Sequence, residues 1–276
     1  MPTTTPSPAS EWLDAAWLDA VVGIGRRAGR EILDVYGTDF ETHSKADDSP
    51  LTQADLRAHR LIVAELAALQ PKLPVLSEES ADIPWDERRG WLRYWLVDPL
   101  DGTKEFVSRN GEFTVNIALI DRHRPVLGVV HIPVSDTTYS GIPGQGAWRE
   151  ANDRARVSIG VRRLSRPPLR VVGSRSHGSP ALERALDALG PHELRAAGSS
   201  IKLCLVADGS ADLYPRLGPT SEWDIAAGQA VVEAAGGQVV RLNDGQAMRY
   251  NAQESYLNPE FLAYGDPECF RRWPRS

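Results

Sequence analysis

Segments of helical periodicity alternate with segments of strand character along the chain, and this alternation constrains the fold more than any other feature. Apolar residues recur every three to five positions over residues 11–36, and a second helical pattern begins at the capping-box sequence Thr52-Gln53-Ala54-Asp55 and ends before Pro71. The alternating run 113–120 and the run 126–132 predict two paired strands. Helices and strands that interleave in this way indicate an α/β or α+β fold.

The second half of the chain continues the alternation. A basic stretch at residues 157–170, which contains Pro167-Pro168, is the expected domain boundary. Beyond it we predict strands at residues 169–172 and 238–242, and helices at residues 180–189 and 224–235. The length of the chain fits one large domain or two modest ones, and the boundary at residues 157–170 would divide it into two parts.

Composition excludes several classes of protein. With 276 residues, of which 42% are hydrophobic and 25% charged, the chain can bury an ordinary core. The excess of 37 acidic over 31 basic residues argues against a nucleic-acid-binding surface. No stretch approaches the roughly 18 apolar residues of a membrane span, and residues 1–8 lack the features of a signal peptide, so we expect a cytoplasmic protein.

The run Asp98-Pro99-Leu100-Asp101-Gly102 carries the strongest chemical signal. A short apolar strand over residues 94–97 is expected to end at Asp98, where Pro99 fixes a turn and Asp101 returns to the same side. Two carboxylates on one tight turn repel each other, and a divalent cation is the natural compensation. Because the donors are oxygens, Mg²⁺ or a similar hard ion is favoured over zinc. A type I turn without a metal is the local alternative.

Other acidic residues stand at the ends of predicted elements. Glu78 follows a short apolar run, Asp224 lies where a helix is expected to begin, and Asp55 is the last residue of the capping box. Each has a local alternative. Glu78 fits a solvated acidic loop, Asp224 an N-cap, and Asp55 a capping role. These acids are informative mainly as a set.

Three blocks together resemble the metal-binding signatures of the lithium-sensitive, Mg²⁺-dependent inositol monophosphatase superfamily. They are Glu78, the run Asp98-Pro99-Leu100-Asp101-Gly102-Thr103 and the run Trp223-Asp224-Ile225-Ala226-Ala227-Gly228. The resemblance extends from about residue 20 to Pro259. Within the superfamily, further segments resemble the bacterial CysQ branch, the 3′(2′),5′-bisphosphate nucleotidases: residues 44–50, 74–79, 104–106, 109–114, 174–177, 198–202 and 214–220.

The resemblance implies a layered α-β-α-β-α sandwich of the inositol monophosphatase and fructose-1,6-bisphosphatase type. We accordingly expect a disordered tail over residues 1–10 and an N-terminal α+β metal-binding domain over residues 11–160. A C-terminal α/β domain over residues 161–276 is expected to complete the active site.

The resemblance also implies a site that holds two or three Mg²⁺ ions. Its ligands would be Glu78, Asp98, Asp101, Asp224 and the backbone carbonyl of Leu100. Asp55 and Thr103 would orient or deprotonate the attacking water. Substrate contacts would come from Glu78, Leu100, Asp101 and Asp224 and from Gly102, Thr103, Ser174, Arg175, His177, Ser199, Ser200, Lys202 and Arg216. Locally, His177 also fits an ordinary loop histidine, and residues 198–200 a simple turn.

The implied reaction is hydrolysis of the 3′-phosphate of adenosine 3′,5′-bisphosphate to AMP and phosphate, a step that serves sulfur assimilation. Two same-class alternatives are an inositol monophosphatase and a fructose-1,6-bisphosphatase, because the metal centre handles only the phosphate. A different-class alternative is a non-catalytic nucleotide or metal sensor. A homodimer and peripheral attachment to the inner face of the cell membrane are left open.

Overall fold

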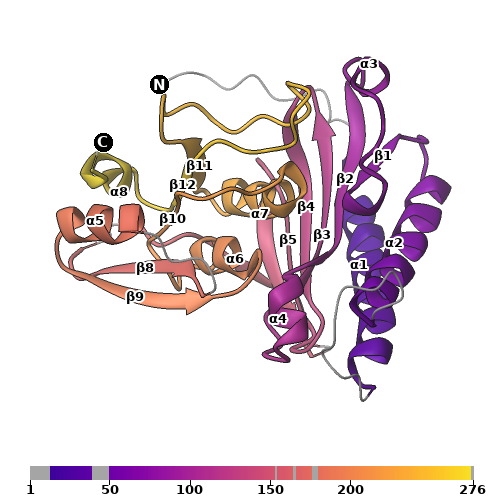
Figure 1. Ribbon diagram of the computed structural model, residues 1–276, viewed down its shortest axis with the longest axis horizontal. Coiled ribbons are helices and arrows are strands. Elements are labelled where there is room, and N and C mark those ends of the chain that lie inside the picture. The colour runs from indigo at the N-terminus through magenta and orange to yellow at the C-terminus, as the bar shows by residue number, and fades with distance from the viewer. Residues whose placement is uncertain (1–12, 39–49, 153, 164–165, 176–179, 275–276) are drawn as a thin grey trace.

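Five layers make up the protein, in the order helices, sheet, helices, sheet, helices (Figure 1). The computed structural model describes residues 13–38, 50–152, 154–163, 166–175 and 180–274. The expected α-β-α-β-α sandwich is therefore confirmed. The predicted disordered tail, residues 1–10, lies outside the described residues.

Helices α1 (Ala15–Tyr36) and α2 (Pro50–Ala68) form the first layer (Figure 1). Asp14 caps α1, because its Oδ1 accepts a hydrogen bond from Trp17 N at 3.0 Å. The capping-box prediction for α2 is wrong: the helix begins at Pro50, so Asp55 lies within it and has no capping role. That placement removes the local alternative for Asp55.

The first sheet follows chain order, with β1 parallel to β2 and every later neighbour antiparallel. Alternate residues of a strand point to opposite faces, so Trp95 and Val97 pack in the core cluster that contains α1 and α2 residues, whereas Tyr94 and Leu96 pack in the cluster that contains α6 and α7 residues. The predicted pairing of residues 113–120 with 126–132 is confirmed. The strands of the first sheet are β1 (Val75–Ser77), β2 (Arg93–Asp101), β3 (Thr114–Asp121), β4 (Arg124–Ile132), β5 (Thr137–Ile142), β6 (Gly146–Ala151) and β7 (Val157–Ile159).

Strand β2 contains a bulge where the sequence predicted a terminating turn. Asp98 lies opposite Asn116 and Asp101 lies opposite Thr114, so β2 takes three steps where β3 takes two. The prediction that the strand ends at Asp98 is wrong, because pairing with β3 resumes after Pro99. A bulge is one of the few positions at which a strand tolerates proline.

The middle layer consists of α6 (Ile201–Ala207) and α7 (Glu222–Ala234), between the two sheets (Figure 1). Helix α7 approaches β4 so closely that a Cβ atom added at Gly128 would lie 2.2 Å from Ala227 O. Residues on all sides of α7 are buried, so the helix is fixed between the layers. Its first turn is therefore a firmly held platform for Asp224.

The second sheet has the order β11-β12-β10-β8-β9, and α5 (Pro180–Leu189) and α8 (Pro267–Arg272) cover its outer face. Its strands are β8 (Leu169–Ser174), β9 (His192–Ala197), β10 (Leu213–Arg216), β11 (Gln238–Arg241) and β12 (Phe261–Tyr264). Short helical elements lie in the connections between strands of the first sheet: η2 (Glu78–Ser80) and α3 (Trp85–Arg88) between β1 and β2, and α4 (Thr103–Val107) between β2 and β3. The domain division at residue 160 stays a prediction. Among the described helices, none is both long and apolar enough to traverse a bilayer.

Candidate active site

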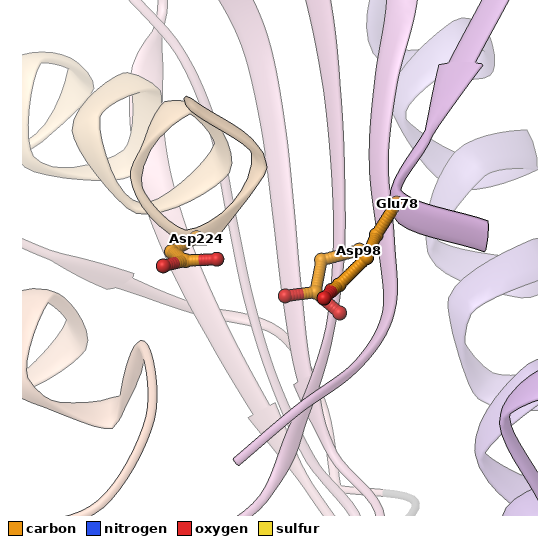
Figure 2. A group of neighbouring side chains, drawn as sticks. All are labelled: Glu78, Asp98 and Asp224. Atoms are coloured by element: carbon orange, nitrogen blue, oxygen red, sulfur yellow. The ribbon is translucent and has the colours of Figure 1, made fainter. Parts of the chain in front are cut away.

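Three carboxylates from different elements converge between the first sheet and α7. Glu78 begins η2 directly after β1, Asp98 lies at the bulge of β2, and Asp224 lies in the first turn of α7. One carboxylate oxygen from each lies within 4.8 Å of the others. Figure 2 shows Glu78 beside Asp98, with Asp224 extending toward them from α7. We call these three residues the acidic cluster.

Backbone hydrogen bonds orient two members of the acidic cluster. Asp98 Oδ1 accepts a hydrogen bond from Leu100 N at 3.0 Å, within the bulge. Asp224 Oδ2 accepts one from Ser221 N at 2.9 Å. Helix α7 begins at Glu222 with Ser221 as its N-cap, so the N-cap alternative for Asp224 is wrong. In the described part of the chain, no hydrogen-bond partner reaches the buried Asp98 Oδ2.

Asp101 lies next to the acidic cluster and is held from both halves of the chain. Its Oδ2 accepts hydrogen bonds from Ser200 N at 2.7 Å, Asn116 Nδ2 at 3.3 Å and Thr114 Oγ1 at 3.4 Å. Ser200 Oγ also donates to the backbone carbonyl of Asp224 at 2.5 Å. Ser200, predicted as a substrate contact, therefore also joins Asp101 to the first turn of α7.

Asp55 and Thr103 lie on different helices near the acids. Asp55 is half-buried on α2, and among the described residues its buried Oδ1 has no hydrogen-bond partner. Thr103 is exposed at the start of α4. Among the described residues, no hydrogen bond joins the two side chains. Their joint action on a water molecule stays a prediction.

Loss of hydration and repulsion between carboxylates raise the pKa values of Glu78, Asp224, Asp55 and Asp98. Burial and the charge of Asp101 raise the pKa of Glu78 to about 7, although its side chain keeps contact with solvent. The same two causes raise the pKa of Asp224 to about 8. Burial and the charges of Glu79 and Glu78 raise the pKa of Asp55 to about 9. The pKa of Asp98 is also raised, by burial and then by Glu78.

The donor set fits a hard divalent cation. All side-chain donors are carboxylate oxygens, the preferred ligands of Mg²⁺. Asp98 Oδ2 and Asp55 Oδ1 are buried acceptors that the described protein leaves unsatisfied, and a cation would satisfy such atoms. A bound cation would also favour the ionised forms of the acids, whose pKa values are raised without it.

A cavity of about 290 Å³ lies beside the acids, between α4, α6, α7 and β10. Asp101 and Asp224 form part of its wall, and Lys104, Lys202 and Arg216 place positive charge around it. The cavity brings together nine of the predicted site residues: Asp101, Gly102, Thr103, Ser174, Ser199, Ser200, Lys202, Arg216 and Asp224. An acidic wall joined to basic side chains suits a phosphate ester that is bound through metal and cations together.

Two basic side chains of the cavity, Lys202 and Arg216, donate hydrogen bonds to backbone carbonyls. Lys202 Nζ donates to Ser199 O at 2.5 Å and to Ala197 O at 3.3 Å. Arg216 donates to Pro219 O at 2.8 Å through Nη2 and to Gly218 O at 3.2 Å through Nε. Burial lowers the pKa of Lys202 to about 8, and the nearby Asp101 carboxylate partly opposes this shift.

Of the predicted substrate contacts that the structure describes, Glu78, Leu100 and Arg175 do not line this cavity. Arg175 is exposed and forms a bidentate ion pair with Glu112 instead of lining the cavity. His177 lies outside the described residues. These contacts stay predictions.

Sequence reasoning missed the residues that hold the acids. Asn116 and Thr114 lie in a strand otherwise rich in apolar residues, and a buried polar residue there is a signal that was available. The charge of Glu79 contributes to the raised pKa of Asp55, but the sequence alone assigned this residue no role in the site. Glu112 lies in the loop between α4 and β3, and the sequence does not indicate that it accepts a hydrogen bond from Gly198 N.

Comparison with known proteins defines the class. The model of the inositol monophosphatase family matches residues 14–266, and this chain belongs to that family. The 3′(2′),5′-bisphosphate nucleotidase CysQ of Shigella flexneri is 52% identical over 252 residues, which covers 88% of this chain and 98% of that protein. The protein of the same name from Escherichia coli K12 is 51% identical over 247 residues, with the same coverage. The crystal structure of CysQ from Bacteroides thetaiotaomicron matches with a TM-score of 0.82 and 41% identity, covering 91% of this chain and 97% of that one.

Proposed function

We propose that this protein is a Mg²⁺-dependent phosphatase that converts adenosine 3′,5′-bisphosphate to AMP and phosphate. The observation that carries the proposal is the unneutralised acidic cluster beside a cation-lined cavity, in a chain about half identical to nucleotidases named CysQ across 98% of their length. Its place would be the cytoplasm, in sulfur assimilation. The oligomeric state, including a homodimer, is a matter for measurement.

The metal ligands we propose are Glu78, Asp98, Asp101, Asp224 and the carbonyl of Leu100, which together would hold two or three Mg²⁺ ions. Ions bound there supply a water of lowered pKa and neutralise charge on the phosphoryl oxygens. The bulge of β2 and the first turn of α7 keep the carboxylates in place, through Leu100 N and Ser221 N. Phosphoryl transfer needs mostly positioning and charge stabilisation, so no protein nucleophile is required.

Asp55 and Thr103 would handle the attacking water. Asp55 Oδ1 has no partner among the described residues, and in its ionised form, which a bound cation would favour, it is suited to accept a proton from the water. Thr103 Oγ1 would orient the same water from the start of α4. The water oxygen would attack phosphorus and give one of its protons to Asp55, and the bond from phosphorus to the 3′-oxygen would break. The 3′-oxygen would take a proton from solvent to become the hydroxyl of AMP, and the phosphate would keep the second proton of the water.

The nucleotide would occupy the cavity with its 3′-phosphate toward the acids. Lys202 and Arg216 would contact the remaining phosphate, and Ser174, Ser199 and Gly102 would line the nucleoside. The acids repel a polyanion until metal binds, so we expect metal to bind before substrate.

The test is phosphate release from three substrates in parallel, with Mg²⁺: adenosine 3′,5′-bisphosphate, inositol 1-phosphate and fructose 1,6-bisphosphate. The proposal predicts the highest kcat/KM on the nucleotide. Equal or faster hydrolysis of either sugar phosphate would replace it with one of the same-class alternatives. Binding of the nucleotide without phosphate release would indicate a sensor.

A further inference from the structure

We propose that Glu112 and Arg175 are a positioning pair that holds one wall of the substrate cavity. The wall is the segment Gly198-Ser199-Ser200, and we call it the serine segment. Ser199 and Ser200 line the cavity, whereas Glu112 and Arg175 do not. The inference rests on the proposed function, because it concerns the cavity in which the nucleotide would bind.

A hydrogen-bonded chain connects the pair to the serine segment. Arg175 donates to Glu112 at 3.0 Å through Nε and at 2.8 Å through Nη2, so the guanidinium fixes the plane of the carboxylate. Glu112 Oε2 then accepts a hydrogen bond from Gly198 N at 2.8 Å. Arg175 Nη2 also donates to Ala196 O at 3.3 Å, which ties the same guanidinium to the end of β9.

The far end of the serine segment is held in a similar way. Ser200 N donates to Asp101 Oδ2 at 2.7 Å, so carboxylates from the first half of the chain hold both Gly198 and Ser200. Ser199 between them has a φ of +39°, which a non-glycine residue keeps only when its surroundings impose it. The buried Ser199 Oγ has no partner within the described part of the chain. The two anchored ends thus hold Ser199, a residue of the cavity wall, in this unusual backbone conformation.

The serine segment is closely packed against the loop that contains Glu112, and it also contacts Lys202 of the cavity. A Cβ atom added at Gly198 would lie 2.5 Å from Glu105 Cγ and 2.7 Å from Glu112 O, so the backbone lies directly against this loop. Ser199 O also accepts the hydrogen bond from Lys202 Nζ. A shift of the serine segment would therefore move a hydroxyl and a cation of the cavity at once.

An ordinary surface ion pair is the competing interpretation, and the chain offers a matched control. Arg241 binds Asp244 in the same bidentate manner, at 3.0 and 2.6 Å, and Asp244 also accepts a backbone hydrogen bond, from Gln246 N at 3.0 Å. The two pairs are comparably exposed, at 47% and 27% for Arg175 and Glu112 and 31% and 41% for Arg241 and Asp244. Asp244 is not part of the cavity wall.

The experiment compares the full-length wild type with Glu112→Ala, Arg175→Lys and Asp244→Ala. We expect Glu112→Ala to weaken AMP binding, measured by calorimetry with Mg²⁺, about tenfold, because it removes a hydrogen bond to a charged acceptor. The KM for adenosine 3′,5′-bisphosphate should rise by a similar factor while kcat changes less than about twofold. Arg175→Lys should weaken AMP binding about threefold, because lysine keeps the positive charge but cannot form the bidentate hydrogen bonds of the guanidinium. Asp244→Ala should match the wild type in both assays.

Hydrogen exchange supplies a readout that does not depend on activity. The Gly198 amide should exchange faster in Glu112→Ala than in Asp244→Ala or the wild type. Unchanged AMP affinity in Glu112→Ala would overturn the inference even if the wild type hydrolyses the bisphosphate. Equal losses in Glu112→Ala and Asp244→Ala would also overturn it, because the effect would be one of general stability. A wild type that binds AMP without hydrolysing the bisphosphate would defeat the proposed function while the AMP comparison still tested the pair.

Discussion

Two aspartates, Asp98 and Asp212, are equally buried but have opposite surroundings. Asp212 is 0% exposed, and its carboxylate accepts hydrogen bonds from Arg162 Nη1 at 3.1 Å and Arg170 N at 2.7 Å. Asp98 is 1% exposed, and the charges that act on it come from other acids, above all Glu78. Arginine side chains therefore neutralise the buried carboxylate of Asp212, whereas the charged groups that act on Asp98 are other carboxylates.

The difference separates a structural carboxylate from one that requires an external partner. Removing an ion from water costs several kcal/mol unless opposite charge and hydrogen bonds compensate it. Asp212 has its compensation inside the protein, whereas the acidic cluster must obtain it from solution or remain partly protonated. The chain has 37 acidic and 31 basic residues. Without the five acids of the proposed site (Asp55, Glu78, Asp98, Asp101 and Asp224), 32 acidic residues remain, which nearly balance the 31 basic ones. The acidic excess is therefore concentrated where we propose that metal binds.

The largest expected effect comes from Asp98→Asn, which should reduce hydrolysis of adenosine 3′,5′-bisphosphate by roughly two orders of magnitude or more. Outer-shell partners of metal ligands are worth about 10- to 100-fold, and a ligand should be worth at least as much. The fold should persist, because the change removes repulsion. Steady-state phosphate release and circular dichroism check both parts. Near-normal turnover in the purified variant would remove Asp98 from the metal site.

The matching change at the other carboxylate, Asp212→Asn, should act on stability. We expect the free energy of unfolding to fall by about 2 kcal/mol, because two arginines lose a buried counter-charge while their outer parts stay hydrated. Turnover per folded molecule should be unchanged. Urea denaturation followed by fluorescence measures the first quantity. A large loss of turnover with unchanged stability would show that Asp212, like Asp98, acts in the reaction and not in the stability of the fold.

A third expectation concerns pH. The folded-state pKa values of about 7 for Glu78, about 8 for Asp224 and about 9 for Asp55 lie above their unfolded values of about 4. Between these limits the folded protein holds more protons than the unfolded chain, so the contribution of these acids to stability is lost as pH rises from about 4 to about 9.

Mg²⁺ should reverse that loss, so its effect on the thermal midpoint should be larger at about pH 8 than at about pH 5.5. Differential scanning calorimetry of the wild type and Asp98→Asn, with Mg²⁺ or with a chelator, measures this. An equal gain at both pH values would mean that protonation of the acids and metal binding are not linked.

The smallest effect is expected at the exposed pair Arg241–Asp244. Asp244→Asn should change the free energy of unfolding by less than about 1 kcal/mol, because exposed ion pairs are screened and lose side-chain entropy. Chemical denaturation at low and high salt checks it. A loss as large as that of Asp212→Asn would show that burial is not what distinguishes these carboxylates.

Local sequence patterns predicted much of the fold but not all of its details. The alternation of apolar and polar residues in β3 and β4 is a local property, and their pairing was predicted correctly. The bulge at Asp98 was not, because it depends on continued pairing with β3 beyond Pro99. The start of α2 was also misplaced, since a capping-box sequence at residue 52 fits the interior of a helix equally well.

The candidate site was predictable in its acids and not in their supports. The family resemblance grouped Asp98 and Asp101 with Glu78 and Asp224 in one expected site, and the structure brings oxygen atoms of Glu78, Asp98 and Asp224 within 4.8 Å of one another. The contacts of Ser200 with Asp101 and Asp224 join residues about 100 and 24 positions away, which no local pattern encodes. Arg175 binds Glu112 and does not line the cavity, so its predicted contact with substrate stays a prediction.

Direct titration with Mg²⁺ tests the central claim, that the acidic cluster takes its counter-charge from solution. Calorimetry of the wild type, Asp98→Asn and Asp212→Asn at about pH 7.5, in two buffers of different ionisation enthalpy, measures affinity and proton release together. We predict that the wild type and Asp212→Asn bind Mg²⁺ with release of protons, and that Asp98→Asn binds it far more weakly. A wild type that binds no Mg²⁺, or an Asp98→Asn variant that binds it equally well, would contradict the account.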